Sequence, residues 1–177
     1  LGFIEALVNK LYSENLIDLK RVYAVGYSNG GMMSYALACY KSNLIAAIGS
    51  VSGYMLQSTS SVSESECTPS HSIPLIKLHG TTDYYDGEGV YNSVDSVLNF
   101  WVSFNNTNTD PIINNIDDNG TSITSYKYEN GDNNVSVEHY KIIGGEHVWF
   151  NNDFNGKNTG QLIWDFVSKY DIDGLIE

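Results

Sequence analysis

The apolar positions of the chain fall into two alternating patterns, which predict helices and strands in turn. Three segments carry apolar side chains at helical spacing: 1–12, 90–104 and 160–170. Three others are short, nearly continuous apolar runs that predict buried strands: 21–25, 43–53 and 73–78. Helices that alternate with buried strands predict a mostly parallel sheet with helices on both faces. We expect the first helix to pack on one face of this sheet.

The remaining segments predict a hairpin and several loops. Two apolar runs, 122–129 and 135–143, flank the turn-forming residues 130–134 and so predict a β-hairpin. Residues 105–120 are rich in Asn and Asp and show no period, and we expect them to be irregular. The serine-rich segment 54–72 is expected to be a surface loop. The length of 177 residues is that of a single domain.

The first predicted strand runs directly into the sequence GYSNG at 26–30 and then into a buried helix. A Gly-x-Ser-x-Gly pattern places its serine in a strained strand-to-helix turn, where a Cβ two residues before or after the serine would clash. Gly26 and Gly30 have no Cβ and so avoid this clash. In this interpretation Ser28 is the exposed nucleophile. The backbone N–H of Asn29, at the helix N-terminus, would stabilise a developing negative charge. The alternative interpretation is an ordinary glycine-rich turn.

Composition limits the partners that this chain can bind. The formal net charge is −12, from 21 acidic and 9 basic residues, so nucleic acids and anionic membrane surfaces are poor partners. A neutral or weakly charged substrate fits this charge better. No apolar run reaches transmembrane length. Cys39 and Cys67 allow one disulfide at most, and Cys39 is most simply a small core residue.

Three residue types that suit acyl transfer stand at the ends of predicted strands. Ser28, Asp83 and His147 follow one another in the order nucleophile, acid, base, which is the order of α/β-hydrolases. Because parallel strands present their carboxyl ends at one edge of the sheet, we expect the three side chains to meet. Asp83 could instead cap a helix, with Asp86 or Glu88 as the acid, and His147 could be a surface histidine.

The other histidines have simpler interpretations. His79 ends a buried strand and is expected to be a structural hydrogen-bonding residue, whereas His71 and His139 look like solvated positions. His79 and His147 could bind a metal together with Asp83, but a metal site would leave the serine turn unexplained. We therefore expect no metal and no cofactor.

The aromatic residues divide between the core and the substrate cleft. Trp101 and Trp164 fall on helical stripes and are expected in the core. Trp149 stands two residues after His147 and Tyr27 directly before Ser28. We expect these two side chains in the substrate cleft.

The segments GYSNGGMMSYALAC, LHGTTD and GGEHVW resemble those of the polyhydroxybutyrate depolymerase and feruloyl/acetylxylan esterase family of α/β-hydrolases. That family has Gly-x-Ser-Asn-Gly-Gly-Met at its nucleophile, His-Gly-Thr-x-Asp at its acid and Gly-Gly-x-His-x-Trp at its base. The resemblance implies that Ser28, Asp83 and His147 are a catalytic triad, with Asn29 as a backbone donor. It implies a serine esterase acting through an acyl-enzyme on short acyl, feruloyl, acetyl or hydroxyalkanoate esters, free or attached to a polysaccharide or polyester.

The chain departs from this family in two places. In the family the acid begins the sequence Asp-x-x-Val-Pro-Tyr, whereas here Asp83 is followed by Tyr-Tyr-Asp-Gly-Glu. The first strands of the family, with the loop that donates the second oxyanion N–H, are not among residues 1–177. We expect residues 1–177 to be an N-terminally truncated α/β-hydrolase core from a secreted or periplasmic protein. Without those strands Val22–Val25 forms an open apolar edge, which we expect a second copy or an N-terminal fragment to cover. The rival interpretations are a non-catalytic carbohydrate-binding or structural remnant and a serine peptidase of the same fold.

Overall fold

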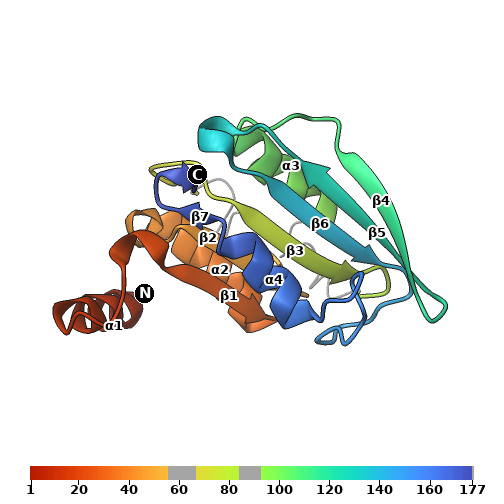
Figure 1. The fold of residues 1–177 in the computed structure, drawn as a ribbon, viewed down its shortest axis with the longest axis horizontal. Coiled ribbons are helices and arrows are strands. Elements are labelled where there is room, and N and C mark those ends of the chain that lie inside the picture. Colours follow the sequence, from red (N-terminus) through yellow and green to blue (C-terminus); the bar gives the residue numbers. More distant parts are fainter. Residues whose placement is uncertain (56–66, 84–92, 177) are drawn as a thin grey trace.

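The computed structural model describes residues 1–55, 67–83 and 93–176, which build a twisted sheet between two layers of helices (Figure 1). The sheet has six strands in the order β1-β2-β3-β6-β5-β4. Strands β1, β2, β3 and β6 are parallel to one another, and β5 and β4 extend the sheet in antiparallel pairing. The strands are β1 (Tyr23–Tyr27), β2 (Ala47–Val51), β3 (Leu75–Gly80), β4 (Ile112–Asp118), β5 (Thr121–Tyr128) and β6 (Val137–Ile142). The mostly parallel sheet and the predicted hairpin of β5 and β6 are thus confirmed.

Helices cover both faces of the sheet, as the alternating pattern predicts. The helices are α1 (Gly2–Ser13), α2 (Asn29–Tyr40), α3 (Val94–Phe104) and α4 (Thr159–Val167). Side chains of α2 and α3 pack with Leu75 and Val137 in one core cluster, whereas α4 packs with Ile76 and Leu78 in a second cluster. Successive residues of a strand point to opposite faces, so β3 contributes alternately to the two clusters. The core therefore lies on both sides of the central strands.

Side-chain caps fix where two of these helices begin. The hydroxyl of Ser93 accepts the backbone N–H of Ser96 at the start of α3, and the amide oxygen of Asn158 accepts that of Gln161 at the start of α4. Each bond satisfies one of the backbone donors that a helix N-terminus leaves free. The predicted helix at 90–104 accordingly begins at Val94 in the described residues, and 90–92 lie outside them.

Helix α1 forms as predicted, but it does not cover a face of the sheet. Phe3 is 75% exposed and Tyr12 51% exposed, and Val8 alone in the helix is buried. α1 lies beyond the sheet, next to the start of β1 (Figure 1), and Ile4 is its residue that packs against the core cluster of α2 and α3. An ion pair of 2.6 Å between Glu5 and Lys41 joins α1 to the end of α2.

The prediction of an irregular chain at 105–120 is wrong, because strand β4 occupies its second half. β4 lies at the edge of the sheet, where Ile116 is the strand's buried residue, so it needs no apolar period. The turn into β5 passes through Asn119 at φ 51° and Gly120 at φ 91°, a left-handed pair that favours a tight hairpin. A short terminal hairpin of β7 (Tyr170–Asp171) and β8 (Gly174–Leu175) also lacked a signal in the sequence.

A disulfide joins Cys39 of α2 to Cys67, which precedes β3. Both cysteines are buried, so the interpretation of Cys39 as simply a small core residue is incomplete. The bond closes a stretch with a sequence separation of 28 residues. It thereby connects the helix that follows Ser28 to the segment that leads into β3.

Candidate active site

Ser28 stands alone between β1, which ends at Tyr27, and α2, which begins at Asn29. Its backbone has φ 52° and ψ −118°, a region that costs a non-glycine residue about 1–3 kcal/mol. Two hydrogen bonds hold this conformation: the N–H of Ser28 donates to Val51 O at 2.9 Å, and its carbonyl accepts Met32 N–H at 3.0 Å. The predicted strained turn with a serine at its apex is therefore present.

The glycines around Ser28 serve different purposes. A Cβ on Gly26 would lie within 2.6 Å of three backbone atoms of Gly30, so Gly26 is required by the close approach of strand and helix. A Cβ on Gly30 would meet nothing within 4 Å, and the prediction that it would clash is wrong. Gly31 is the second constrained position, because its Cβ would lie 2.6 Å from Ser50 Oγ and 3.0 Å from Gly53 Cα. In the sequence, the second glycine of the Gly-Gly pair at 30–31 indicates this close approach.

The structure brings Ser28, Asp83 and His147 into one hydrogen-bonded chain. Nε2 of His147 lies 2.8 Å from Ser28 Oγ, and Nδ1 lies 3.1 Å from each carboxylate oxygen of Asp83. An ionised carboxylate only accepts hydrogen bonds, so the proton of the neutral imidazole is on Nδ1. Nε2 then faces the serine hydroxyl with a lone pair. This arrangement can remove the Ser28 proton when the oxygen attacks a carbonyl.

Adjacent strands position the acid and the base. Asp83 follows β3 and His147 follows β6, and these strands pair in parallel with Gly80 opposite Ile142. A Cβ on Gly80 would lie within 2.8 Å of three backbone atoms of Gly145, so the two loops touch through their backbones. Thr82 ties them together, since its N–H and Oγ1 donate to Gly145 O at 2.9 and 2.7 Å. The Gly-Thr-Thr and Gly-Gly sequences beside the two side chains were the signal for this contact.

Asp83, the candidate acid, is the buried member of this hydrogen-bonded group. The side chain of Asp83 is fully buried, whereas that of His147 is 36% exposed. The hydroxyl of Tyr54 lies 2.8 Å from Asp83 Oδ1, and Nε2 of His79 lies 3.4 Å from Oδ2. Tyr54 had no recognisable signal in the sequence, because it falls at the start of a serine-rich segment. Two buried side chains, Tyr54 and His79, thus face this carboxylate, and the partly exposed His147 contacts both of its oxygens.

The sequence also allowed other acids, a helix-capping role for Asp83 and a metal site. Asp86 and Glu88 lie outside the described residues. In the described residues the next helix, α3, is capped by Ser93 and not by Asp83. In the part of the chain that the structure describes, no group of three or more His, Cys, Asp or Glu side chains could hold a metal ion. His79 and His147 instead contact Asp83 from two sides.

Two of the other histidines are less solvated than predicted. His139 is 4% exposed, stacks on the ring of Tyr126 at 5.9 Å, and has Nδ1 3.2 Å from Lys77 O. Burial is the largest cause that lowers the pKa of His139, to about 3. His71 is half-buried between two backbone carbonyls, with Nδ1 2.8 Å from Ser72 O and Nε2 2.9 Å from Ser42 O. The prediction of solvated positions is wrong for both.

The two aromatic residues expected at the cleft lie in different surroundings. Tyr27 packs on His147, with ring centroids 5.3 Å apart, and its hydroxyl donates to the carbonyl of His147 at 2.8 Å. Trp149 is 40% exposed and lines a cavity of about 340 Å³ together with Val25 and Trp164. Trp164 is 56% exposed, so its prediction as a core residue is wrong, whereas Trp101 is fully buried as predicted.

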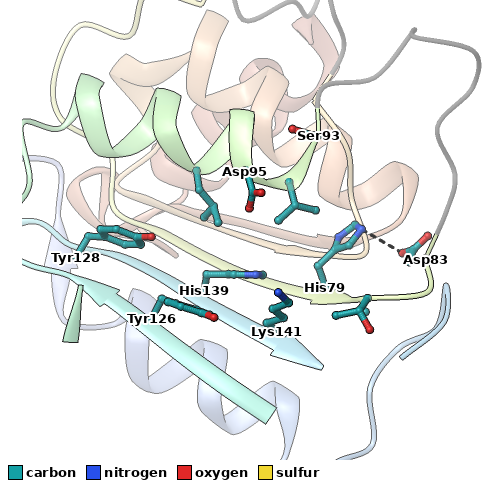
Figure 2. Close-up of a pocket in the computed structure, with 12 residues that line it drawn as sticks. His79, Asp83, Ser93, Asp95, Tyr126, Tyr128, His139 and Lys141 are labelled. Carbon is teal, nitrogen blue, oxygen red and sulfur yellow. Dashed lines mark ion pairs between the residues drawn. The ribbon is translucent and has the colours of Figure 1, made fainter. Parts of the chain in front are cut away.

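A larger cavity of about 560 Å³ opens on the other side of the acid, between the start of α3 and strands β5 and β6 (Figure 2). His79 and Asp83 line one end of it, Tyr126 and Tyr128 line the other end, and Lys141 lies beside His79 (Figure 2). Among the described lining residues none belongs to the Ser28 turn. This cavity therefore borders the buried side of Asp83 and not the serine.

Comparison with known proteins identifies related sequences. The sequence model of the Phospholipase/Carboxylesterase family matches residues 2–109. A bifunctional acetylxylan esterase/xylanase of Neocallimastix patriciarum is 29% identical over 98% of this chain and 24% of its own length. Feruloyl esterase B of Piromyces equi is 26% identical over 96% of this chain and 31% of its own length. The chain thus spans about a quarter to a third of these curated relatives.

Solved structures share the fold at low sequence identity. An acetyl xylan esterase from Aspergillus awamori aligns with a TM-score of 0.62 and 15% identity, over 94% of this chain and 66% of that one. The crystal structure of esterase PE8 aligns with a TM-score of 0.57 and 14% identity, over 93% and 58% of the two chains. Within the described residues, no helix is both long and apolar enough to cross a bilayer.

Proposed function

Since the chain belongs to the Phospholipase/Carboxylesterase family, we propose that it is a serine carboxylic ester hydrolase that forms an acyl-enzyme on Ser28. The observation that carries the proposal is the hydrogen-bonded chain from Ser28 Oγ through His147 to Asp83, with 2.8 Å between the serine oxygen and Nε2. The serine occupies a strained turn and is half-buried, whereas the acid is fully buried behind the base. This division of burial suits a nucleophile that must meet substrate and an acid that must only orient the base.

In the proposed reaction Ser28 Oγ attacks the ester carbonyl while His147 Nε2 takes its proton. The resulting imidazolium is stabilised by Asp83, and it returns the proton to the leaving alcohol as the tetrahedral intermediate collapses. Water then attacks the acyl-enzyme by the same route and regenerates Ser28. The backbone N–H of Asn29, the first residue of α2, is the donor that we assign to the oxyanion, because helix N-termini favour negative charge.

Two features narrow the substrate to neutral esters that reach an open site. The chain carries a net charge of −12, which disfavours anionic substrates. The relatives named above are esterases of acetylated xylan and of feruloyl groups. We therefore place acetyl and feruloyl esters of polysaccharides first among the substrates, with short acyl and hydroxyalkanoate esters behind them. Tyr27 and Trp149 are the side chains that we assign to the cleft.

The disulfide and the sheet edge bear on location and partners. The buried bond between Cys39 and Cys67 supports an oxidising compartment, in line with a secreted or periplasmic protein. Strand β1 is an edge strand in the described sheet, and Val25 on it is 43% exposed. We propose that a second copy or an N-terminal fragment covers this edge in solution. A stable monomer in light scattering, with no co-purifying fragment, contradicts this.

The activity is tested with p-nitrophenyl acetate and butyrate together with a fluorophosphonate label. Labelling and turnover are expected in the wild type and are expected to vanish in Ser28→Ala, because the label reacts only with an activated serine. Ser103→Ala, which removes an exposed serine on α3, is the matched control and should retain both. Hydrolysis that survives in Ser28→Ala contradicts the assignment.

The substrate class is tested in parallel on acetylated xylan, methyl ferulate and a short peptide amide. Release of acetate or ferulate with no peptide cleavage supports an esterase over a peptidase of the same fold. A folded wild type that neither labels nor turns over any ester supports the non-catalytic remnant instead.

A further inference from the structure

A lysine lies at the centre of the sheet, directly behind the candidate triad. Lys77 is fully buried on β3, where its Nζ donates to Gly53 O at 2.7 Å and lies 5.8 Å above the ring of Tyr35. Lysine is almost never buried completely unless it is paired, because desolvation of the ammonium is costly. Burial lowers the pKa of Lys77 to about 7, and the charge of Asp83 opposes that shift. The remaining contact of Nζ is with His79 Nδ1 at 3.2 Å.

His79 joins this lysine to the triad's acid. Lys77 and His79 are two residues apart on β3, so both project from the same face, and the other ring nitrogen of His79 lies 3.4 Å from Asp83 Oδ2 (Figure 2). Nε2 is buried and has no hydrogen bond of good geometry to any described residue. Asp83 is therefore the acceptor available to it, because an unprotonated nitrogen at that distance would face the carboxylate with a lone pair.

The protonation state of His79 follows from its two neighbours. Burial and the nearby positive charge of Lys77 hold the pKa of His79 far below its usual range, so the ring is neutral and carries one proton. Lys77 presents an N–H to Nδ1 whether it is charged or neutral, since even the amine keeps two N–H bonds for Gly53 O and His79. The ring proton is thus on Nε2, the nitrogen that lies 3.4 Å from Asp83 Oδ2.

We propose, on the premise of the proposed esterase, that Lys77 and His79 are positioning residues that hold Asp83 in place for His147. Lys77 fixes His79 in the Nε2–H tautomer, and His79 donates that hydrogen to Oδ2 of the carboxylate. The hydroxyl of Tyr54 shares its one hydrogen between Oδ1 at 2.8 Å and the backbone carbonyl of Asp83 at 2.6 Å, so that the carboxylate is contacted at both oxygens while Nδ1–H of His147 lies between them. The carboxylate then stays oriented when His147 becomes an imidazolium, which is when its charge matters most.

The tautomer of His79 is measured by two-bond ¹H–¹⁵N correlation on protein labelled with ¹⁵N-histidine, a readout that needs no activity. The signals of His79 are assigned by their loss in His79→Gln. We expect the neutral Nε2–H pattern in the wild type and a mixture of tautomers in Lys77→Met, which has a similar length but no N–H. Lys141→Met, which removes an exposed lysine of β6 beside the same cavity, should leave the His79 signals unchanged.

The kinetic arm compares two substitutions at His79. His79→Leu keeps apolar bulk but has no donor, whereas the amide of His79→Gln can place an N–H close to the position of Nε2. We expect kcat on p-nitrophenyl acetate to fall about 10–100-fold in the leucine variant, the range for groups that orient metal-bound histidines. KM should not change, and the glutamine variant should recover most of kcat. Leu78→Val, on the opposite face of β3, controls for lost packing and should keep kcat.

The outcomes separate this proposal from the esterase itself. A wild-type chain without esterase activity overturns the proposed function. The tautomer of His79 then still tests the proposed contacts among Lys77, His79 and Asp83. An Nδ1–H tautomer of His79, or His79 signals that do not respond to Lys77→Met, overturns the role of the lysine. Equal kcat values for the leucine and glutamine variants overturn the role of the histidine.

Discussion

A single methyl group added on one side of Ser28, the proposed nucleophile, should slow its reaction, whereas the same group on the other side should not. In Gly26→Ala the new Cβ would lie within 2.6 Å of three backbone atoms of Gly30, although ordinary contacts begin at 3.4 Å. Strand and helix must therefore separate by about 1 Å, and overpacking of this kind typically costs about 1–3 kcal/mol of stability. In Gly30→Ala the new Cβ meets nothing within 4 Å.

The displacement acts on the distance that matters for chemistry. Ser28 Oγ is 2.8 Å from His147 Nε2, so a shift of about 1 Å takes the pair beyond hydrogen-bond range. A misplacement of about 1 Å can cost about 100-fold in rate, and we expect that loss in Gly26→Ala. Gly30→Ala should keep the rate and gain up to about 1 kcal/mol, since alanine is preferred over glycine inside a helix.

The assay is the rate of fluorophosphonate labelling and kcat on p-nitrophenyl acetate, with thermal unfolding of both variants measured alongside. The two variants differ by position alone, so each is the control for the other. Equal labelling of folded Gly26→Ala and Gly30→Ala would refute the reasoning, because the turn could then accommodate a Cβ at either glycine.

Three further outcomes follow from buried groups. Asp83→Asn should reduce kcat far more than Asp86→Asn, because an amide at the triad position favours the wrong imidazole tautomer; the reverse ranking in kinetic assays moves the acid to Asp86. The pKa of His139 is lowered from 6.5 to about 3, so between those values the unfolded chain binds a proton that the folded chain does not. Stability in urea unfolding should therefore fall as the pH drops through that window, and it should fall less steeply in His139→Phe; equal slopes contradict this. Replacing Cys39 and Cys67 together by serine should lower the unfolding free energy by about 3.5 kcal/mol, given the separation of 28 residues, and an unchanged urea midpoint would contradict it.

The parts of the fold that the sequence predicts are those whose side chains report directly on burial. Central strands such as β3 are buried on both faces and read as apolar runs. Strand β4 shows the opposite case, since it pairs through its backbone at an edge and exposes Asn114 and Asn115. Strand pairing at an edge satisfies backbone groups whatever the side chains are, so the polar run at 105–120 hid it.

Burial of polar side chains was the property least visible in the sequence. β6 alternates polar residues and looks half solvated, yet His139 is covered by β5 and by the residues that line the large cavity. Lys77 is likewise a charged residue in an apolar strand, and its partners come from the end of β2 and from α2. Tyr54 meets Asp83 across a sequence separation of 29 residues. Such contacts depend on tertiary packing, which no local pattern records.

The three residues of the candidate triad could be predicted because the topology removes most of the freedom in their placement. Parallel strands deliver their carboxyl ends to one edge, so residues that follow β1, β3 and β6 must lie near one another once the strands are adjacent. The last few ångströms are set by backbone contacts, since Gly80 meets Gly145 closely enough to exclude a Cβ. The glycines of the two motifs thus permit the close backbone contact that leaves His147 Nδ1 3.1 Å from the carboxylate of Asp83. It follows that the local sequences around the acid and the base constrain the site as strongly as the two side chains themselves.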